Sequence, residues 1–157
     1  MRRKKETAVL LWNIRSEHNV GSIFRTADAA GVSLIYLGGI TPHPIDRFGR
    51  KKKTIAKTAL GAEEFVPWKP ARSAVQLIRR LHKEGWSVVG VEQDKRAVDY
   101  RRYVPRTKTL YVLGSEVEGL PKNIRDACDT IVEIPMRGRK ESLNVSVAAG
   151  VILFLSK

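Results

Sequence analysis

Residues 109–134 read TLYVLGSEVEGLPKNIRDACDTIVEI, and this segment indicates how the whole chain folds. Its two apolar runs, Thr109–Leu113 and Thr130–Ile134, have the length and the composition of buried β-strands. Between them, a loop with two glycines leads into Lys122–Ala127, which we predict to be a helix. A strand followed by a loop, a helix and a second strand is typical of a parallel α/β sheet.

Short apolar runs alternate with amphipathic segments on both sides of this unit as well. We predict further strands at Ala8–Trp12, Ser33–Leu37, Glu64–Pro67 and Trp86–Val91. We predict further helices at Ser22–Ala30, Arg72–Glu84 and Asn144–Leu155. The expected fold class is therefore α/β, a mostly parallel sheet flanked by helices, and residues 1–157 are expected to form a single domain.

The charge of the chain favours a polyanionic partner. Lys and Arg number 29 against 16 Asp and Glu, which gives a net charge of +13. RNA, DNA and an acidic membrane surface are all compatible with this excess. The longest apolar stretch, Val147–Leu155, is far too short to span a bilayer, and Ala8–Trp12 is too short for the core of a signal peptide. We therefore expect no membrane span and a cytoplasmic protein.

Cysteine and histidine offer little metal chemistry. Cys128 is the only cysteine, so no disulfide can form within the chain. Together with His18, His43 and His82 it has none of the spacings typical of zinc sites. We expect no structural metal.

Three polar loops follow predicted strands, at the strand ends where α/β sheets bind ligands. In the first, residues 19–27, Asn19 or Ser22 is expected to cap the helix while Arg25 projects from the same end. The alternative is a plain cap with a surface arginine. The second loop, Gly114–Leu120, places two glycines around Glu116, and a simple turn is the alternative there. Neither dinucleotide nor phosphate-loop glycine spacing is present.

The third segment runs from Ile134 to Ala148 and joins a strand to the last helix through a basic loop. Ser142 and Asn144 stand at the N-terminus of that helix. They could serve only as caps, but with free backbone N–H groups they could also hold a small polar ligand. A methionine such as Met136 is more often a core residue than a ligand contact.

Together the three segments resemble the signature motifs of the SpoU/TrmH family of RNA methyltransferases. The first pattern, N-x-G-x-x-x-R-[ST]-A, is met by Asn19, Gly21, Arg25, Thr26 and Ala27. The second, G-x-E-x-x-G, is met by Gly114, Glu116 and Gly119, and the third, I-P-M…S-L-N-x-S-x-A, by residues 134–148. Their order and spacing agree with the family, and the resemblance covers about residues 8–155.

This resemblance implies a C-terminal trefoil knot and transfer of a methyl group from S-adenosylmethionine to a ribose 2′-hydroxyl of structured RNA. It implies a homodimer in which the first and last helices pack together, so Phe24 and the Val147–Leu155 face are candidates for the interface. We expect residues 1–157 to include no additional RNA-binding domain, which slightly favours tRNA over rRNA as the substrate.

The resemblance also assigns site residues. The catalytic candidates are Arg25, Asn19, Glu116, Ser142 and Asn144. The cofactor-binding candidates are Leu113, Gly114, Ser115, Gly119, Ile134, Pro135, Met136, Ser142, Leu143 and Asn144. The basic residues expected to contact RNA are Arg47, Arg50, Lys51, Lys52, Lys53, Lys57, Arg137, Arg139 and Lys140, and we expect residues 47–57 to form a mobile surface loop. A merely solvated charged surface is the alternative for these cations.

Two other functions stay open at this point. One is an RNA-binding protein of the same fold that does no chemistry, against which the intact motif residues speak. The other is a methyltransferase that modifies an RNA base, although the motif with Asn19 and Arg25 resembles the ribose-modifying branch.

Overall fold

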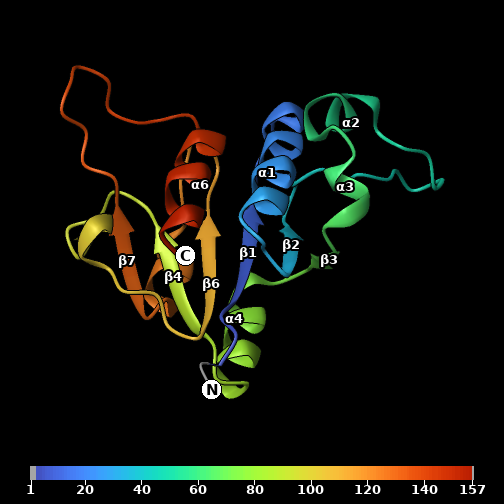
Figure 1. Ribbon diagram of the computed structural model, residues 1–157. Coiled ribbons are helices and arrows are strands. Elements are labelled where there is room, and N and C mark those ends of the chain that lie inside the picture. The colour runs from blue at the N-terminus through green and yellow to red at the C-terminus, as the bar shows by residue number, and fades with distance from the viewer. Residues whose placement is uncertain (1–2, 157) are drawn as a thin grey trace.

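The computed structural model describes residues 3–156, and it contains one sheet in which every pair of neighbouring strands is parallel (Figure 1). The strands are β1 (Glu6–Trp12), β2 (Leu34–Gly38), β3 (Trp68–Ala71), β4 (Ser87–Val91), β5 (Val98–Asp99), β6 (Lys108–Leu113) and β7 (Thr130–Glu133). Their order across the sheet is β3-β2-β1-β6-β4-β7-β5. The predicted α/β architecture is confirmed.

Helices cover both faces of the sheet. They are α1 (Glu17–Ala29), α2 (Lys53–Ala59), α3 (Ala62–Phe65), α4 (Ala74–Lys83), α5 (Lys122–Ala127) and α6 (Val145–Leu153), with 3-10 turns at Tyr100–Arg102 and Phe154–Ser156. One face carries α1 and α6 side by side, with α2 and α3 next to α1, and the other carries α4 and α5 (Figure 1). None of the helices in residues 3–156 is long and apolar enough to cross a membrane.

The alternation of side chains along β1 explains why this strand is apolar throughout. Val9 and Leu11 pack under α1 and α6, whereas Ala8 and Leu10 pack under α4. Because both faces are covered, all four are buried and none needs to be polar.

The predicted strand Glu64–Pro67 is wrong, because Glu64 and Phe65 belong to helix α3 and the strand β3 begins only at Trp68. Gly61 has a φ of 94° and turns the chain from α2 into α3. Glu64 lies in the first turn of α3, where a negative charge is favourable. β3 then forms the edge of the sheet, which tolerates Pro70.

Helix α1 begins earlier than predicted. Its cap is Ser16, whose Oγ accepts a hydrogen bond from the backbone N–H of Asn19 at 3.1 Å, so neither Asn19 nor Ser22 is the cap. The side chain of Asn19 is therefore free for other contacts. The same helix buries Phe24 completely against the sheet, which corrects its assignment to a dimer interface.

The expectation of a loop over residues 47–57 holds only in part. Residues 53–57 belong to helix α2, and a bridge between Ile45 and Lys51 closes the segment before it.

Candidate active site

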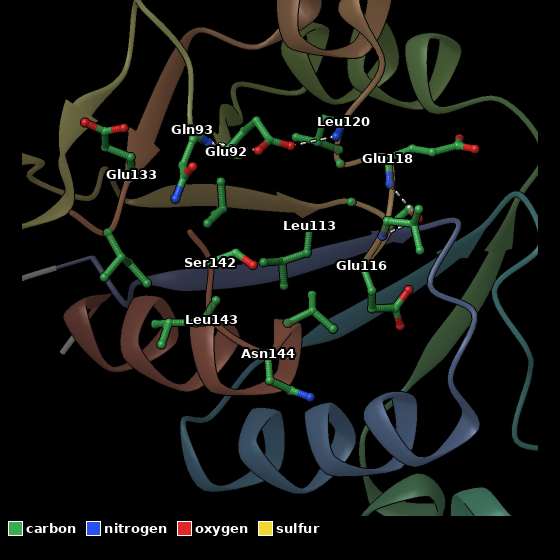
Figure 2. A pocket seen from close by; sticks show the side chains of 18 of the residues that line it. Glu92, Gln93, Leu113, Glu116, Glu118, Leu120, Glu133, Ser142, Leu143 and Asn144 are labelled. Carbon is green, nitrogen blue, oxygen red and sulfur yellow. Dashed lines mark hydrogen bonds between the residues drawn. The ribbon is translucent and has the colours of Figure 1, made fainter. Parts of the chain in front are cut away.

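A cavity of about 590 Å³ lies at the carboxyl ends of β4, β6 and β7 (Figure 2). Three loops and the first turns of α6 form its walls. Every predicted cofactor residue except Pro135 lines it, together with Val91, Glu92, Gln93, Glu116, Val117, Glu118, Leu120, Arg125, Glu133, Val145 and Ala148. Parallel sheets bind ligands at this edge, so the cavity is the candidate active site.

The loop after β6 can make its tight turn only with glycine at two positions. A Cβ on Gly114 would lie 2.6 Å from the carbonyl carbon of Gly119, with no room to move. Gly119 itself has a φ of 66°, and a Cβ there would lie 2.2 Å from Oε2 of Glu92. The glycines of the second motif thus let the loop close on itself, and they leave bare backbone at the cavity.

Ser115 holds the same loop from inside. Its buried hydroxyl accepts hydrogen bonds from the N–H groups of Val117 at 3.2 Å and Glu118 at 3.3 Å. Its carbonyl accepts the N–H of Gly119 at 2.9 Å. The loop is therefore ordered by its own chain before any ligand binds.

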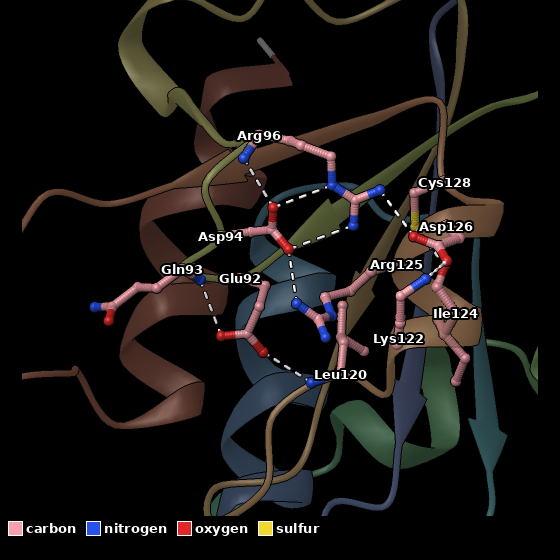
Figure 3. Close-up of polar contacts among 10 residues, drawn as sticks. All are labelled: Glu92, Gln93, Asp94, Arg96, Leu120, Lys122, Ile124, Arg125, Asp126 and Cys128. Atoms are coloured by element: carbon pink, nitrogen blue, oxygen red, sulfur yellow. Dashed lines mark hydrogen bonds and ion pairs between the residues drawn. The ribbon is translucent and has the colours of Figure 1, made fainter.

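Glu92, at the end of β4, joins this loop to the neighbouring strand (Figure 3). Its carboxylate accepts the N–H of Leu120 at 2.8 Å and the N–H of Gln93 at 2.9 Å. Neither Glu92 nor Gln93 was among the predicted site residues, although both follow the predicted strand Trp86–Val91. The rule that drew attention to the other loops applies to this one as well.

Beside the cavity, two arginines share one carboxylate (Figure 3). Asp94 accepts hydrogen bonds from Nε of Arg96 at 3.1 Å and from Nη1 of Arg125 at 2.7 Å. Hydrogen bonds from Arg96 and Arg125 hold the pKa of the Asp94 carboxyl well below its usual range. Arg125, which lines the cavity, is therefore fixed in place by an ionised partner.

Glu116 connects the loop after β6 to the start of α1. Its oxygens accept the backbone N–H of Arg15 at 3.1 Å, the N–H of Ser16 at 3.3 Å and Nδ2 of Asn19 at 3.2 Å. Partial burial raises the pKa of the Glu116 carboxyl, but hydrogen bonds from its own N–H and these donors outweigh burial and hold it below the ordinary 4.5. Glu116 is thus an ionised acceptor that orients Asn19.

Asn144 makes the corresponding connection from α6. It caps this helix through Oδ1, which accepts the N–H of Ser146 at 2.8 Å. Its Nδ2 donates to Oδ1 of Asn19 at 3.2 Å. Asn19, Glu116 and Asn144 therefore form one chain of hydrogen bonds, and Ser142 lines the cavity just before Asn144.

The family model described as the SpoU rRNA Methylase family matches residues 6–154. The chain belongs to the SpoU methylase family. The chain is 38% identical over 150 residues to the 23S rRNA (guanosine-2′-O-)-methyltransferase RlmB of Ralstonia nicotianae, a match that covers 93% of the chain and 56% of that protein. It spans just over half the length of the curated relatives it matches.

Solved structures of the family have the same fold. The TrmH/SpoU tRNA modifying enzyme of A. aeolicus has a TM-score of 0.84 at 29% identity, over 99% of this chain and 75% of that one. The AdoMet-bound rRNA methyltransferase of Sinorhizobium meliloti has a TM-score of 0.84 at 30% identity, over 99% of this chain and 57% of that one.

Of the five catalytic candidates of this SpoU chain, Asn19 and Arg25 do not line the cavity. Asn19 is hydrogen-bonded to Glu116 and Asn144, which do line it, whereas Arg25 is not. Arg25 is exposed, and within residues 3–156 no hydrogen bond or ion pair holds its guanidinium. Gly21, one turn earlier, packs on α2, and Thr26, the next residue, lies beside Gly150 of α6. Arg25 therefore projects outward from α1, between these two helices, and does not line the cavity of its own chain.

The basic residues of the SpoU chain fall into two groups. Arg137, Arg139 and Lys140 are exposed on the loop between β7 and α6, beside the cavity. Of the other cluster, Arg50, Lys51 and Lys52 pair with Asp46, Glu64 and Glu17, respectively. Arg47, Lys53 and Lys57 have no acidic partner among the described residues.

Proposed function

We propose that this SpoU-family protein transfers a methyl group from S-adenosylmethionine to a ribose 2′-hydroxyl of RNA. One observation carries the proposal: the hydrogen bonds of Asn19 with Glu116 and Asn144 join all three motifs beside one cavity. The relatives named as RNA methyltransferases, one of them a 2′-O-methyltransferase, support the reaction class.

The cavity suits S-adenosylmethionine in size and chemistry. Its volume of about 590 Å³ lies in the range of small-molecule sites. Leu113, Ile134, Met136 and Leu143 offer apolar walls for an adenine ring. Ser142 and Asn144 offer polar groups for the ribose and the amino-acid end of the cofactor. When bound, the cofactor supplies a sulfonium methyl group open to attack by a nucleophile.

We assign the chemistry of the hydroxyl to Arg25. A ribose hydroxyl is a weak acid, so the site must stabilise the negative charge that develops on its oxygen. A guanidinium stays protonated in ordinary surroundings, so Arg25 acts as a hydrogen-bond donor to this oxygen and to the adjacent phosphate. An oxygen of that phosphate accepts the hydroxyl proton as the bond from the ribose oxygen to the methyl group forms and the methyl–sulfur bond breaks. Asn19, Glu116, Ser142 and Asn144 orient the reactants, and holding them in line supplies much of the rate gain.

The outward position of Arg25 supports a homodimer. Val147 on α6 and Phe154 just after it are each 51% exposed, which leaves apolar surface uncovered beside α1. We propose that α1 and α6 form the interface between two copies, and that this interface brings Arg25 of one copy toward the cavity of the other.

We propose two further features that the family implies, a trefoil knot at the cavity and a single domain over residues 1–157. The loops after β4 and β7 are in contact, because Nε2 of Gln93 donates to the carbonyl of Glu141 at 2.5 Å. We propose a cytoplasmic location, in keeping with an RNA substrate.

We propose tRNA as the substrate to test first, because the A. aeolicus neighbour is described as a tRNA modifying enzyme; ribosomal RNA is second. The decisive experiment incubates the protein with labelled S-adenosylmethionine and each RNA, digests the RNA and identifies the nucleoside by mass spectrometry. A 2′-O-methyl nucleoside is expected. A base-methylated nucleoside would reassign the enzyme to base modification. Absence of both cofactor binding and transfer would leave a non-catalytic RNA-binding protein.

A further inference from the structure

The segment between β2 and α2 carries a projecting turn, residues 45–51, which we call the Phe48 finger (Figure 1). Ile45 and Lys51 form an antiparallel bridge at its base. Oδ1 of Asp46 accepts the N–H of Phe48 at 2.8 Å and the N–H of Arg50 at 3.0 Å, and the Asp46 N–H donates to the carbonyl of Arg50 at 2.8 Å. The finger is thus held in shape by its own hydrogen bonds.

The tip of the finger presents a solvent-exposed aromatic ring with two cations close to it. Phe48 is 66% exposed. The guanidinium carbons of Arg47 and Arg50 lie 4.8 Å and 5.0 Å from the centre of its ring. Phe48 belongs to neither core cluster and does not line the cavity, so packing does not explain it.

An exposed ring flanked by guanidinium groups matches the chemistry of an unpaired nucleotide. Bases in single strands and loops stack on aromatic side chains, while arginines bind the phosphates on either side. A duplex offers the phosphates but hides the faces of the bases. An apolar protein surface would match Phe48 but would leave Arg47 without an anionic partner, since Arg50 alone of the two is already paired, with Asp46.

The finger is connected to the proposed active site through α1. Lys52, next to the finger, forms an ion pair of 3.5 Å with Glu17 in the first turn of α1. Helix α2 follows, and its Ile55 carbonyl lies against Gly21 of α1. The finger is therefore joined, through Lys52 and α2, to the helix that carries Arg25.

We propose that Phe48 stacks on an unpaired base of the RNA substrate, with Arg47 and Arg50 contacting the neighbouring phosphates. This inference rests on the proposed function, because it takes RNA to be the substrate. It adds a residue that selects single-stranded or looped RNA over duplex.

The test measures the binding of a fluorescein-labelled single-stranded oligouridylate, and of a blunt RNA duplex of equal length, by anisotropy over a range of salt. Phe48→Ala is expected to raise the Kd for the single strand about 5- to 100-fold without changing its salt dependence, because stacking releases no counterions. Phe48→Trp should bind like the wild type. Arg47→Gln should instead lower the salt slope by about 1.

Phe65 provides a matched control. It is 71% exposed, but it follows Glu63 and Glu64 on α3, and no guanidinium from residues 3–156 lies over its ring. Phe65→Ala should leave the affinity for both RNAs unchanged. Unchanged thermal unfolding temperatures would show that the exposed rings at both positions can be removed without unfolding the protein.

Three outcomes would overturn the proposal: equal single-strand affinity for Phe48→Ala and the wild type, an equal loss of affinity for duplex, or no single-strand binding by the wild type. Calorimetry with S-adenosylmethionine and the nucleoside assay distinguish a failure of the Phe48 proposal from a failure of the proposed function. A Phe48 effect without cofactor binding or transfer would uphold the finger and reject the enzyme. Methyl transfer to RNA with no effect of Phe48→Ala on binding would uphold the enzyme and reject the role of the finger.

Discussion

The side-chain amides of Asn19 and Asn144 are hydrogen-bonded to each other at 3.2 Å, although 125 positions separate them in the chain. The other end of the Asn19 amide donates to Glu116 at 3.2 Å. Helix α1, the loop after β6 and the N-terminus of α6 are thus joined through one side chain. A change at any of the three residues should disturb the other two, because each amide orientation depends on its neighbour.

Glu116→Gln should destabilise the protein at neutral pH by about 1 kcal/mol, a value at the low end for bonds to a charged group because solvent screens this exposed site. Glutamine keeps one acceptor oxygen and turns an NH2 group toward a backbone N–H. Since the folded pKa of Glu116 is lowered, its stabilisation is present above the ordinary pKa of 4.5 and is lost as the pH falls through the folded value. The difference in unfolding temperature between the wild type and Glu116→Gln, measured from pH 7 downward, should therefore shrink below about pH 4.

Glu118→Gln is the matched control for this experiment. Its carboxylate is 71% exposed and lies 3.7 Å from Arg15 in a surface ion pair. Its replacement should change the unfolding temperature little at any pH. Equal effects of the two substitutions would contradict the role given to the hydrogen bonds of Glu116.

The segment that could be predicted in most detail from the sequence is the one around the second motif. Lys122–Ala127 is a helix with the predicted bounds, and β6 and β7 differ from the prediction by one residue at one end. Here the apolar runs are distinct, and glycines mark the loop between strand and helix. The carboxyl ends of these parallel strands must then meet at one edge of the sheet, so the cavity could be expected there.

Other features depend on tertiary contacts that no local pattern reveals. Residues 64–67 are too few for periodicity to separate a helix from a strand, and pairing with β2 decides that the strand starts at Trp68. A phenylalanine suits a core and an interface equally well. Its residue type alone therefore could not show that Phe24 is buried between α1 and the sheet. Glu92 belongs to none of the three motifs, and only the fold shows that it holds the loop at Leu120.

Arg25→Ala should lower the rate of methyl transfer about 100-fold or more, because it removes a donor to the developing oxyanion. It should leave the Kd for S-adenosylmethionine and the unfolding temperature nearly unchanged, since Arg25 neither lines the cavity nor has a partner among the described residues. Asn144→Ala should weaken both cofactor binding and transfer, because it lines the cavity and caps α6. Calorimetry and initial rates measure the two effects, and full activity of Arg25→Ala would reject the mechanism.

Lys53→Gln with Lys57→Gln should lower the slope of log affinity for RNA against log salt by about 1.4 to 1.8, if each lysine contacts one phosphate. Both are exposed on α2 and have no acidic partner among residues 3–156. Lys51→Gln is the comparison, because Lys51 already pairs with Glu64 and should contribute less. Filter binding to tRNA at several salt concentrations measures the slopes. An unchanged slope for the double variant would remove α2 from the RNA surface.

Gly21→Ala should destabilise the protein by about 1–3 kcal/mol, because the helices α1 and α2 touch at this glycine. A Cβ there would lie 2.0 Å from Oγ1 of Thr58 and 2.4 Å from the carbonyl oxygen of Ile55. The threonine side chain can rotate away, but the carbonyl belongs to the backbone of α2 and cannot. The helices would have to separate, which shifts the first turn of α1 and with it Asn19.

Gly150→Ala is the control, because this glycine also lies in a helix of the same layer. The nearest atom to its Cβ would be Cγ2 of Thr26 at 3.8 Å, an ordinary contact, and alanine favours the helix by about 0.5–1 kcal/mol. The unfolding temperature should therefore fall by several degrees for Gly21→Ala and stay level or rise for Gly150→Ala. Only Gly21→Ala should also slow methyl transfer, because only that change moves Asn19. Equal unfolding temperatures for the two variants would show that the first motif keeps its glycine for a reason other than the approach of α2.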